Sequence, residues 1–411
     1  MENRLLKNGW LNHYLDYTKE QESPILFHTW VGISVIAGTL RRNCYVDRQY
    51  GILYPNLYVI LVSPTGKCRK SRCARIGVER FLNELDGFEI IREKTTPEAL
   101  ISAMSNHAVK NGSKFIPDST CYIFAPELSI LFGKQTYVDG LVDILTGVYE
   151  GPNKWEYRRN KGNLTLENSL INFLGASNPE WLAKGLNEDS FGGGFMGRTV
   201  CVFEDERKKI AFPTLPEDLR IMLVDDLRKI ADLKGEFKPE KEMVECFKSW
   251  YESFEPDFSG RMAGYLERKQ DLAWKVSMVL SVSERSDLII TQSHFTRALE
   301  LLDIVEKKMS KAFIYIGNTR EASVSQHIVE YLNTREGIAE RKSVIAKVRH
   351  LIRSIREFDA VIETLEQSGL LYKVVRGRTI VYALTEAYDG LISKLNNEES
   401  EQNDINTKIV E

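Results

Sequence analysis

A lysine followed by a serine, Lys70-Ser71, ends a short polar turn that comes directly after the apolar run Leu57–Val62. Such a turn, placed between a strand and a helix, presents backbone N–H groups to phosphate. In nucleotide sites of this kind a lysine reaches the β- and γ-phosphates, and a hydroxyl binds Mg²⁺. We therefore expect an ATP site with Mg²⁺ held at Ser71. The residues predicted to bind the nucleotide are Thr65, Gly66, Lys67, Arg69, Lys70 and Ser71.

The turn departs from the usual glycine-rich pattern at two places. Its first glycine is replaced by Ser63 or Pro64, and the glycine expected before the lysine is Arg69. The alternative interpretation is a basic loop that caps a helix and binds no phosphate.

Two later apolar runs end in polar residues that fit the chemistry of ATP hydrolysis. Glu127 follows Cys121–Ala125 and is predicted to activate the attacking water, or else it is a surface glutamate that begins a helix. Pro126 stands where a metal-side Asp is usual. Asn178 follows Leu170–Gly175, and it orients the water, caps the helix after it, or does both.

Arg198 follows a glycine-rich segment and precedes the apolar run Thr199–Phe203. This arrangement is typical of an arginine finger, which neutralises transition-state charge on the ATP of a neighbouring subunit. The alternative is an ion pair with a surface acid such as Glu204. The predicted catalytic residues are therefore Lys70, Glu127, Asn178 and Arg198.

The four apolar runs read as buried strands separated by helical patterns, which indicates an α/β core with a mainly parallel sheet. We expect a P-loop NTPase core of either the AAA+ or the RecA type. Near the C-terminus, three helices followed by two strands around a glycine turn describe a winged helix. The expected domains are an N-terminal helical segment 1–50, the ATPase core 51–212, a helical lid or linker region 213–318, a winged-helix domain 322–385 and an acidic, disordered tail 386–411.

Basic residues gather at two places that suit nucleic acid. Residues 154–166 read as a hairpin with a basic tip, and the region 341–380 has nine Lys/Arg against four Asp/Glu. Phosphate contacts from such residues give sequence-independent affinity that falls as salt rises. The alternatives are aromatic residues that pack beneath the hairpin and a winged helix that docks a protein. The residues predicted to contact DNA are Arg158, Arg159, Lys161, Arg353, Arg376 and Arg378.

Composition excludes several other classes of protein. The 411 residues carry a net charge of −3 and are 43% hydrophobic, as in ordinary globular proteins. Six scattered cysteines form no C-x-x-C pairs, so we expect neither a disulfide scaffold nor a zinc site. No stretch approaches the length of a membrane span. The prediction is a cytoplasmic protein with reduced thiols and no membrane partner.

Over about residues 8–285 the chain resembles a family of phage, prophage and plasmid P-loop ATPases that are found beside or fused to primases. Members usually have Asp-Glu where this chain has Pro126-Glu127. The order of motifs is also similar to that of minichromosome-maintenance helicases and of self-loading replicative helicases of mobile elements. The segments that carry the resemblance are Phe27-His28, Ile33–Ala37, Tyr54–Tyr58, Arg69–Ser71, Pro126–Leu128, Trp155–Arg158, Gly175–Leu182 and Gly193–Arg198.

The resemblance implies ATP hydrolysis at the subunit interfaces of a homo-oligomeric ring, with a hexamer expected. Single-stranded DNA would occupy the pore, duplex DNA would contact the winged helix, and a primase is a candidate partner. The leading prediction is thus an ATP-dependent, ring-forming DNA helicase of a phage or mobile element. The alternatives are a non-unwinding initiator or loader that binds origin DNA through the winged helix, and a nucleotide-dependent switch with a degenerate site, which Pro126 favours.

Overall fold

In a computed structural model of the protein, the chain divides into two compact units, residues 1–309 and 310–411. The structure describes residue 6 and residues 9–87, 89–92, 94–111, 114–133, 135–158, 162–185, 194–256, 262–316, 320–376, 379–388 and 390–392.

The larger unit is built on a five-stranded sheet with the order β11-β3-β10-β7-β4, in which every pair of neighbours is parallel. All residues of β3, β7, β10 and β11 are buried, as expected of a parallel sheet that is covered on both faces. The α/β fold and the four predicted strands are therefore confirmed, and the edge strand β4 was missed. The strands are β3 (Tyr58–Val62), β4 (Ile90–Arg92), β7 (Thr120–Ala125), β10 (Leu170–Ser177) and β11 (Thr199–Phe203).

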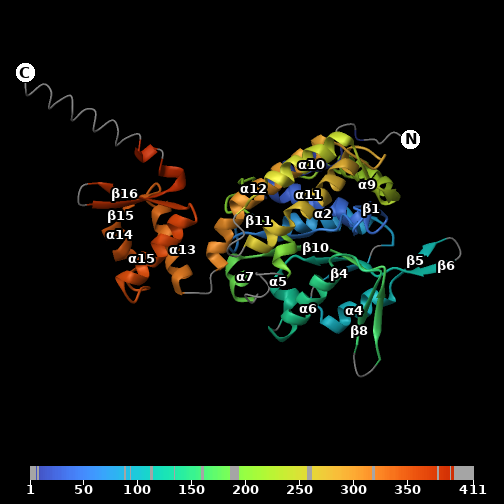
Figure 1. Ribbon diagram of the computed structural model, residues 1–411, viewed down its shortest axis with the longest axis horizontal. Coiled ribbons are helices and arrows are strands. Elements are labelled where there is room, and N and C mark those ends of the chain that lie inside the picture. Colours follow the sequence, from blue (N-terminus) through green and yellow to red (C-terminus); the bar gives the residue numbers. More distant parts are fainter. Residues whose placement is uncertain are drawn as a thin grey trace, which may run out of the picture. The chain divides into compact units, whose positions relative to one another are not determined.

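Helices cover both faces of this sheet (Figure 1). On one face, α2 (Ile25–Leu40) packs against β3, β10 and β11, and every residue of α2 except Ile25 is buried. A helix that is apolar all round must be covered on both sides. The layer beyond α2 comes from helices at both ends of the unit, namely α1 (Trp10–Thr18), α9 (Glu217–Ala231) and α11 (Ala263–Glu284).

The predicted boundary at residue 50 is wrong in two respects. The N-terminal helices belong to the same compact unit as the sheet, and a strand, β1 (Cys44–Asp47), pairs with β2 (Ile52–Leu53) before the first core strand. The helices expected between residues 213 and 318 are present in the same unit up to residue 309. They are α9, α10 (Lys241–Ser253), α11 and α12 (Gln292–Ile316).

The opposite face of the sheet carries α4 (Pro97–Asn106), α5 (Leu128–Phe132) and α6 (Gln135–Val148) (Figure 1). Two antiparallel hairpins alternate with these helices along the chain. One joins β8 (Lys154–Tyr157) to β9 (Leu164–Glu167), as predicted, and the other joins β5 (Ala108–Asn111) to β6 (Lys114–Pro117). The second hairpin was not predicted.

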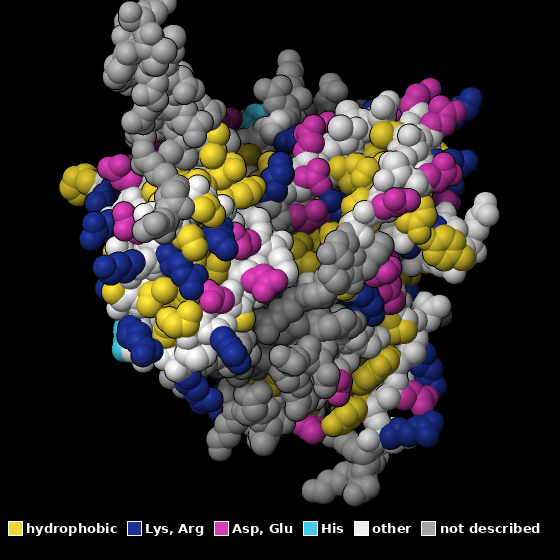
Figure 2. Space-filling view, turned by 60° about the vertical axis from the view of Figure 1, so that its left-hand side comes forward, with side chains coloured by type: hydrophobic (Ala, Val, Ile, Leu, Met, Phe, Trp, Pro, Cys, Tyr) yellow, Lys and Arg dark blue, Asp and Glu magenta, His cyan; other side chains and the backbone are white. Residues whose placement is uncertain are grey.

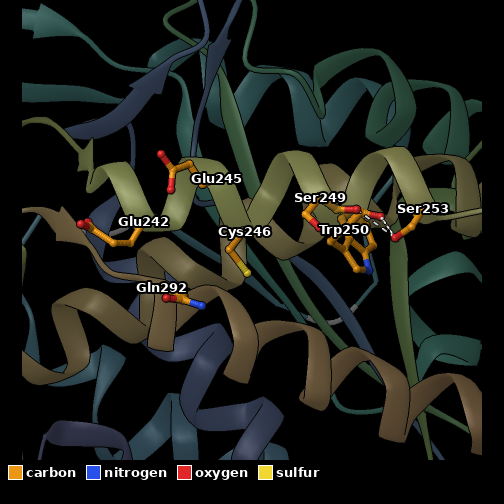
Figure 3. A pocket seen from close by; sticks show the side chains of 7 residues that line it. All are labelled: Glu242, Glu245, Cys246, Ser249, Trp250, Ser253 and Gln292. Carbon is orange, nitrogen blue, oxygen red and sulfur yellow. Dashed lines mark hydrogen bonds between the residues drawn. The ribbon is translucent and has the colours of Figure 1, made fainter.

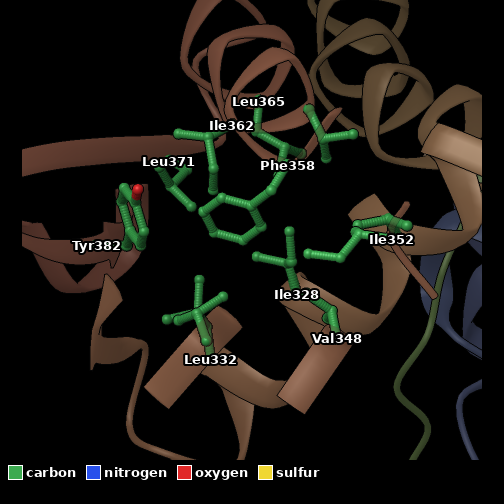
Figure 4. Packing of buried hydrophobic residues seen from close by; sticks show 12 residues of the cluster. Ile328, Leu332, Val348, Ile352, Phe358, Ile362, Leu365, Leu371 and Tyr382 are labelled. Carbon is green, nitrogen blue, oxygen red and sulfur yellow. The ribbon is translucent and has the colours of Figure 1, made fainter. Parts of the chain in front are cut away.

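The smaller unit has its own apolar core, in which Phe358 lies among side chains from its helices and its sheet (Figure 4). Its sheet is antiparallel with the order β15-β17-β16. Three helices and two final strands match the expected pattern, and the short strand β15 was missed. The elements are α13 (Arg320–Asn333), β15 (Ile338–Glu340), α14 (Arg341–Val348), α15 (Ile355–Gln367), β16 (Leu371–Arg376) and β17 (Thr379–Leu384). Of the expected acidic tail 386–411, residues 386–388 and 390–392 are helical, and 393–411 lie outside the described residues.

Candidate functional site

The loop between β3 and α3 (Lys70–Arg80) has an unusual backbone conformation. Gly66, Cys68 and Arg69 all have positive φ, at 75°, 57° and 49°. This region suits glycine and is strained for other residues, and such strain is found mainly where a loop is held for a purpose. Arg69, which stands where a glycine was expected, adopts the left-handed conformation that glycine favours.

Helix α3 begins at Lys70 without a side-chain cap. The first N–H groups of any helix have no intrahelical acceptor, and here no side chain caps them. The positive end of the helix dipole lies at the same place. Thr65 and Lys67 are exposed beside this helix end. The arrangement can bind an anion through backbone N–H groups.

Lys70 is folded back onto its own loop and is only 8% exposed. Its Nζ donates a hydrogen bond to the carbonyl oxygen of Ser63 at 3.1 Å. Burial lowers the pKa of the Lys70 ammonium, whereas the nearby carboxylates of Glu127 and Glu180 raise it. The hydroxyl of Ser71 donates to the carbonyl oxygen of Pro126 at 2.8 Å, so that the start of α3 contacts the residue that follows β7.

Glu127 and Asn178 lie at the same edge of the sheet as Lys70. Register places Val62 beside Ser177, and Ala125 beside Gly175, so β3 and β10 end level and β7 ends two residues earlier at the same side of the sheet. One strand separates β3 from β7, a distance of about 10 Å at the usual spacing between strands. In open parallel sheets ligands bind at this edge, where the strand order reverses.

The Asn178 carboxamide oxygen accepts a hydrogen bond from the Trp181 backbone N–H at 2.6 Å. Asn178 therefore caps the N-terminus of α7 (Pro179–Gly185), which is one of its two predicted roles. The bond uses the carboxamide oxygen and leaves the NH₂ group available, so it does not conflict with the second predicted role, which is to orient the attacking water. Glu127 begins α5 without a side-chain capping bond, and it is half-buried.

Glu22 was not predicted and attaches the β3–α3 loop to the rest of the unit. Its carboxylate accepts from Arg69 Nε at 2.9 Å and from Arg207 Nη1 at 3.2 Å. The hydrogen bond from Arg69 lowers the pKa of Glu22. Cys68 extends the attachment, because its thiol donates to the carbonyl oxygen of Glu206 at 3.1 Å.

Arg198 lies at the amino ends of the sheet strands, whereas Lys70 lies at their carboxyl ends. It directly precedes β11, whose first residue pairs with Tyr58 at the start of β3. The two side chains are thus separated by the length of β3, about 16 Å at the usual rise per residue. Arg198 cannot act on a nucleotide held by Lys70 of the same chain.

Arg198 lies beside a surface acid, as the predicted alternative described, but the acid is Glu150 and not Glu204. Its Nε lies 3.9 Å from a carboxylate oxygen of Glu150, and its Nη1 donates to the Gly194 carbonyl at 3.1 Å. Glu204 pairs instead with Lys308 at 2.6 Å. Burial and the neighbouring guanidinium of Arg268 lower the pKa of Arg198.

Beneath Arg198 lies a buried lysine, Lys275. Its Nζ donates to Asn56 Oδ1 at 2.7 Å and lies 4.0 Å from the centre of the Tyr149 ring. Burial lowers the pKa of Lys275 to about 7. Asn56 in turn donates to the Tyr149 and Ile171 carbonyls, so this network fixes the end of α6 to the starts of β3 and β10.

The β8–β9 hairpin leaves the same edge of the sheet as Arg198. Trp155 and Tyr157 stack on each other, and the Tyr157 hydroxyl donates to Glu98 of α4 at 3.1 Å. The aromatic residues thus pack against the unit, as the alternative interpretation of the hairpin predicts. Arg158 is 82% exposed, with Glu156 at 3.7 Å, while Arg159 and Lys161 lie outside the described residues.

Arg42, at the end of α2, holds the base of this hairpin. Its guanidinium donates to the carbonyl oxygens of Gly151, Pro152 and Ser169 and to Asn153 Oδ1. The base of the hairpin is therefore fixed to a helix that packs on β3. No sequence pattern singled out Arg42, because arginines that follow an apolar helix resemble any other solvated residues.

Among the predicted nucleic-acid residues of the smaller unit, Arg353 is exposed and its backbone N–H donates to Glu357 Oε2 at 2.6 Å. Arg376 ends β16, but its side chain and the whole of Arg378 lie outside the described part of the chain.

A groove of about 460 Å³ runs along α10 and is separate from all the residues above (Figure 3). Six of its seven lining residues come from α10, including Glu242, Glu245, Cys246 and Trp250, and the seventh is Gln292. One open helix face does not enclose a ligand. The described residues contain no group of three or more His, Cys, Asp or Glu that could hold a metal ion, and no helix among them is long and apolar enough to cross a membrane.

Comparison with models of known protein families finds none that matches the chain, and comparison with curated proteins finds no relative. The fold and the positions of these side chains therefore carry the evidence on function.

Proposed function

We propose that the larger unit binds and hydrolyses ATP in the loop between β3 and α3. The supporting observation is the convergence of a positive-φ loop, an uncapped helix start and two polar strand ends at one edge of the parallel sheet. Lys70 would turn from the Ser63 carbonyl to the β- and γ-phosphates, Glu127 would take the proton of the attacking water, and Asn178 would orient that water.

Magnesium fits this site only as part of a nucleotide complex. Mg²⁺ is usually held by one or two protein oxygens together with substrate phosphates and waters. Ser71 supplies such an oxygen next to the end of β7, and no metal-side Asp precedes Glu127. The ion would neutralise charge on the phosphates.

We propose further that the chain acts as a ring in which Arg198 completes the site of the next subunit. Support comes from the position of Arg198 at the far edge of the sheet, which a head-to-tail contact would bring to a neighbour's loop. The Glu150 that pairs with Arg198 lies four residues before β8. A nucleotide that draws Arg198 away from Glu150 would thereby act on the base of the hairpin.

The function that fits best is an ATP-driven DNA translocase or helicase, with the β8–β9 hairpin as its moving contact. The Arg42 contacts favour this proposal over a passive switch, because they join the hairpin to a helix packed on the nucleotide-binding sheet. A non-unwinding loader that binds duplex DNA through the smaller unit is the second candidate, and the basic residues of that unit favour it.

Subunit mixing tests the site and the ring together. Lys70→Ala and Arg198→Ala are each expected to abolish DNA-stimulated ATPase activity. In a random mixture of the two, roughly a quarter of the interfaces join an intact Lys70 to an intact Arg198, so activity should return to about that fraction. Arg75→Ala is a matched control, because Arg75 is an exposed residue of α3 that pairs with Glu79. Full activity of either single variant, or a mixture that stays inactive, would overturn the proposal.

A further inference from the structure

Two neighbouring helices of the smaller unit carry opposite charge. Residues 341–353, which comprise α14 and the turn after it, contain five Lys/Arg and no Asp or Glu. Residues 355–367, which form α15, contain one arginine and four acids. The formal charges are thus +5 and −3 over two consecutive stretches of 13 residues.

The charges of α14 point away from the core. Val344 and Val348 are buried on its inner face, whereas Lys342 and Lys347 are exposed. Arg349 in the following turn is exposed as well. We call the surface formed by Lys342, Lys347, Arg349 and Arg353 the α14 face. Within the described residues, the side-chain nitrogens of these four residues make no ion pair within 4.0 Å, although the backbone N–H of Arg353 donates to the Glu357 carboxylate. Figure 2 shows Lys and Arg side chains gathered on the side of this unit that is turned to the viewer.

The fifth cation, Arg341, has a structural role. Its Nη1 lies 2.6 Å from Asp359 Oδ1 and 2.8 Å from the Tyr382 hydroxyl, and its guanidinium lies over the Phe358 ring. These contacts join the start of α14 to α15 and β17. They also hold one acid of α15 in place.

The outer face of α15 does not suit DNA. Phe358, Val361, Ile362 and Leu365 are buried, and this leaves Asp359 and Glu363 exposed on the solvent side. In a helix-turn-helix protein the second helix enters the major groove with its N-terminal residues at the bases. Placing α15 there would bring two carboxylates close to the phosphates, where like charges repel.

We propose that the smaller unit binds the nucleic-acid backbone through the α14 face, with α15 held away from the phosphates. Exposed lysine and arginine side chains that make no ion pair, here on α14 and the turn after it, bind phosphate without displacing a carboxylate, so each contact releases counterions. Contacts of this kind carry no base information. Binding through the α14 face does not depend on ATP hydrolysis. Because it carries no base information, it disfavours the loader that would recognise a DNA sequence through the smaller unit.

The test is nucleotide-free binding by the full chain, measured by fluorescence anisotropy over a range of salt concentrations. The probes are two duplexes of unrelated sequence and a single strand of equal length. Lys347→Ala/Arg349→Ala should lower the slope of log affinity against log salt by about 1.8 on duplex, and affinity on the order of fifty-fold at 0.1 M salt. A loss on only one form of DNA would show which form the face binds.

Two matched variants complete the design. Arg75→Ala/Arg228→Ala removes two exposed, ion-paired arginines from the larger unit and should change affinity by less than about twofold. Glu363→Gln should have an equally small effect, because α15 lies away from the phosphates. An unchanged salt slope for Lys347→Ala/Arg349→Ala with an unaltered melting temperature, a loss confined to one duplex sequence, or a large gain for Glu363→Gln would overturn the proposal.

Discussion

Replacing Arg42 tests whether the base of the β8–β9 hairpin transmits force from the sheet. The Arg42 side chain makes five hydrogen bonds: Nη1 donates to Gly151, Ser169 and Pro152 at 2.6, 3.1 and 3.3 Å, and Nη2 donates to Asn153 Oδ1 and the Tyr54 hydroxyl, both at 2.7 Å. Three of the acceptors are backbone carbonyls from the two ends of the hairpin. One side chain therefore closes the loop that the hairpin forms.

The expected effect follows from those bonds. Hydrogen bonds to a charged donor contribute about 1.5–3 kcal/mol each, and bonds made by one side chain are not additive. Because Arg42 is half-buried and water can replace part of its contacts, we expect Arg42→Met to lower the free energy of unfolding by about 3–4 kcal/mol. Arg42→Lys keeps the charge but loses the two-pronged geometry, so it should lower that free energy by about 1–2 kcal/mol.

The assay compares ATPase activity with and without DNA, together with urea unfolding. Arg42→Lys should retain the activity without DNA and lose most of the stimulation by DNA. Arg41→Met is the matched control, since Arg41 donates to the Asp86 carbonyl and lies next to Arg42 in the chain. Full DNA stimulation in a folded Arg42→Met protein would refute the coupling.

Two further predictions concern buried and capping groups. Lys275 has a folded pKa of about 7, well below that of an unfolded lysine, so the folded protein binds fewer protons and its stability rises with pH above about 7, by up to about 1.4 kcal/mol per pH unit. Lys275→Met should abolish this rise in urea unfolding measured between pH 7 and 9, and a retained slope would assign it to another group. Asn178→Ala should cost about 1 kcal/mol of stability and most of the ATPase activity, whereas Asn178→Ser should recover the stability alone. Recovery of both would leave capping as the function of Asn178.

Much of the core could be predicted because β3, β7, β10 and β11 are continuous runs of apolar, β-forming residues. The edge strand β4 has three residues, too short a run to stand out. The β5–β6 hairpin could have been found, since Gly112-Ser113, the two residues between the strands, is a hairpin signal in the sequence.

Lys70, Glu127 and Asn178 follow their strands and so meet at the carboxyl ends of the sheet, as parallel pairing requires, whereas Arg198 precedes β11 and lies at the other end. The contacts of Arg42 and Glu22 could not be predicted. Arg42 meets backbone carbonyls more than a hundred positions away, and Glu22 meets Arg69 and Arg207. Hydrogen bonds between such distant segments leave no periodicity in the sequence. The predicted helical segment 1–50 belongs to the same compact unit as the sheet, and the all-apolar α2 itself signals this burial on both sides.

The central claim is that the β3–α3 loop binds the phosphates of ATP. Titration calorimetry of the wild type, Lys70→Ala and the Arg75→Ala control with Mg·ATP tests it most directly. The account predicts saturable, Mg²⁺-dependent binding to the wild type and the control, weakened at least about tenfold by Lys70→Ala, which corresponds to about 1.4 kcal/mol. Absence of binding to the wild type, or equal binding to all three proteins, would contradict it.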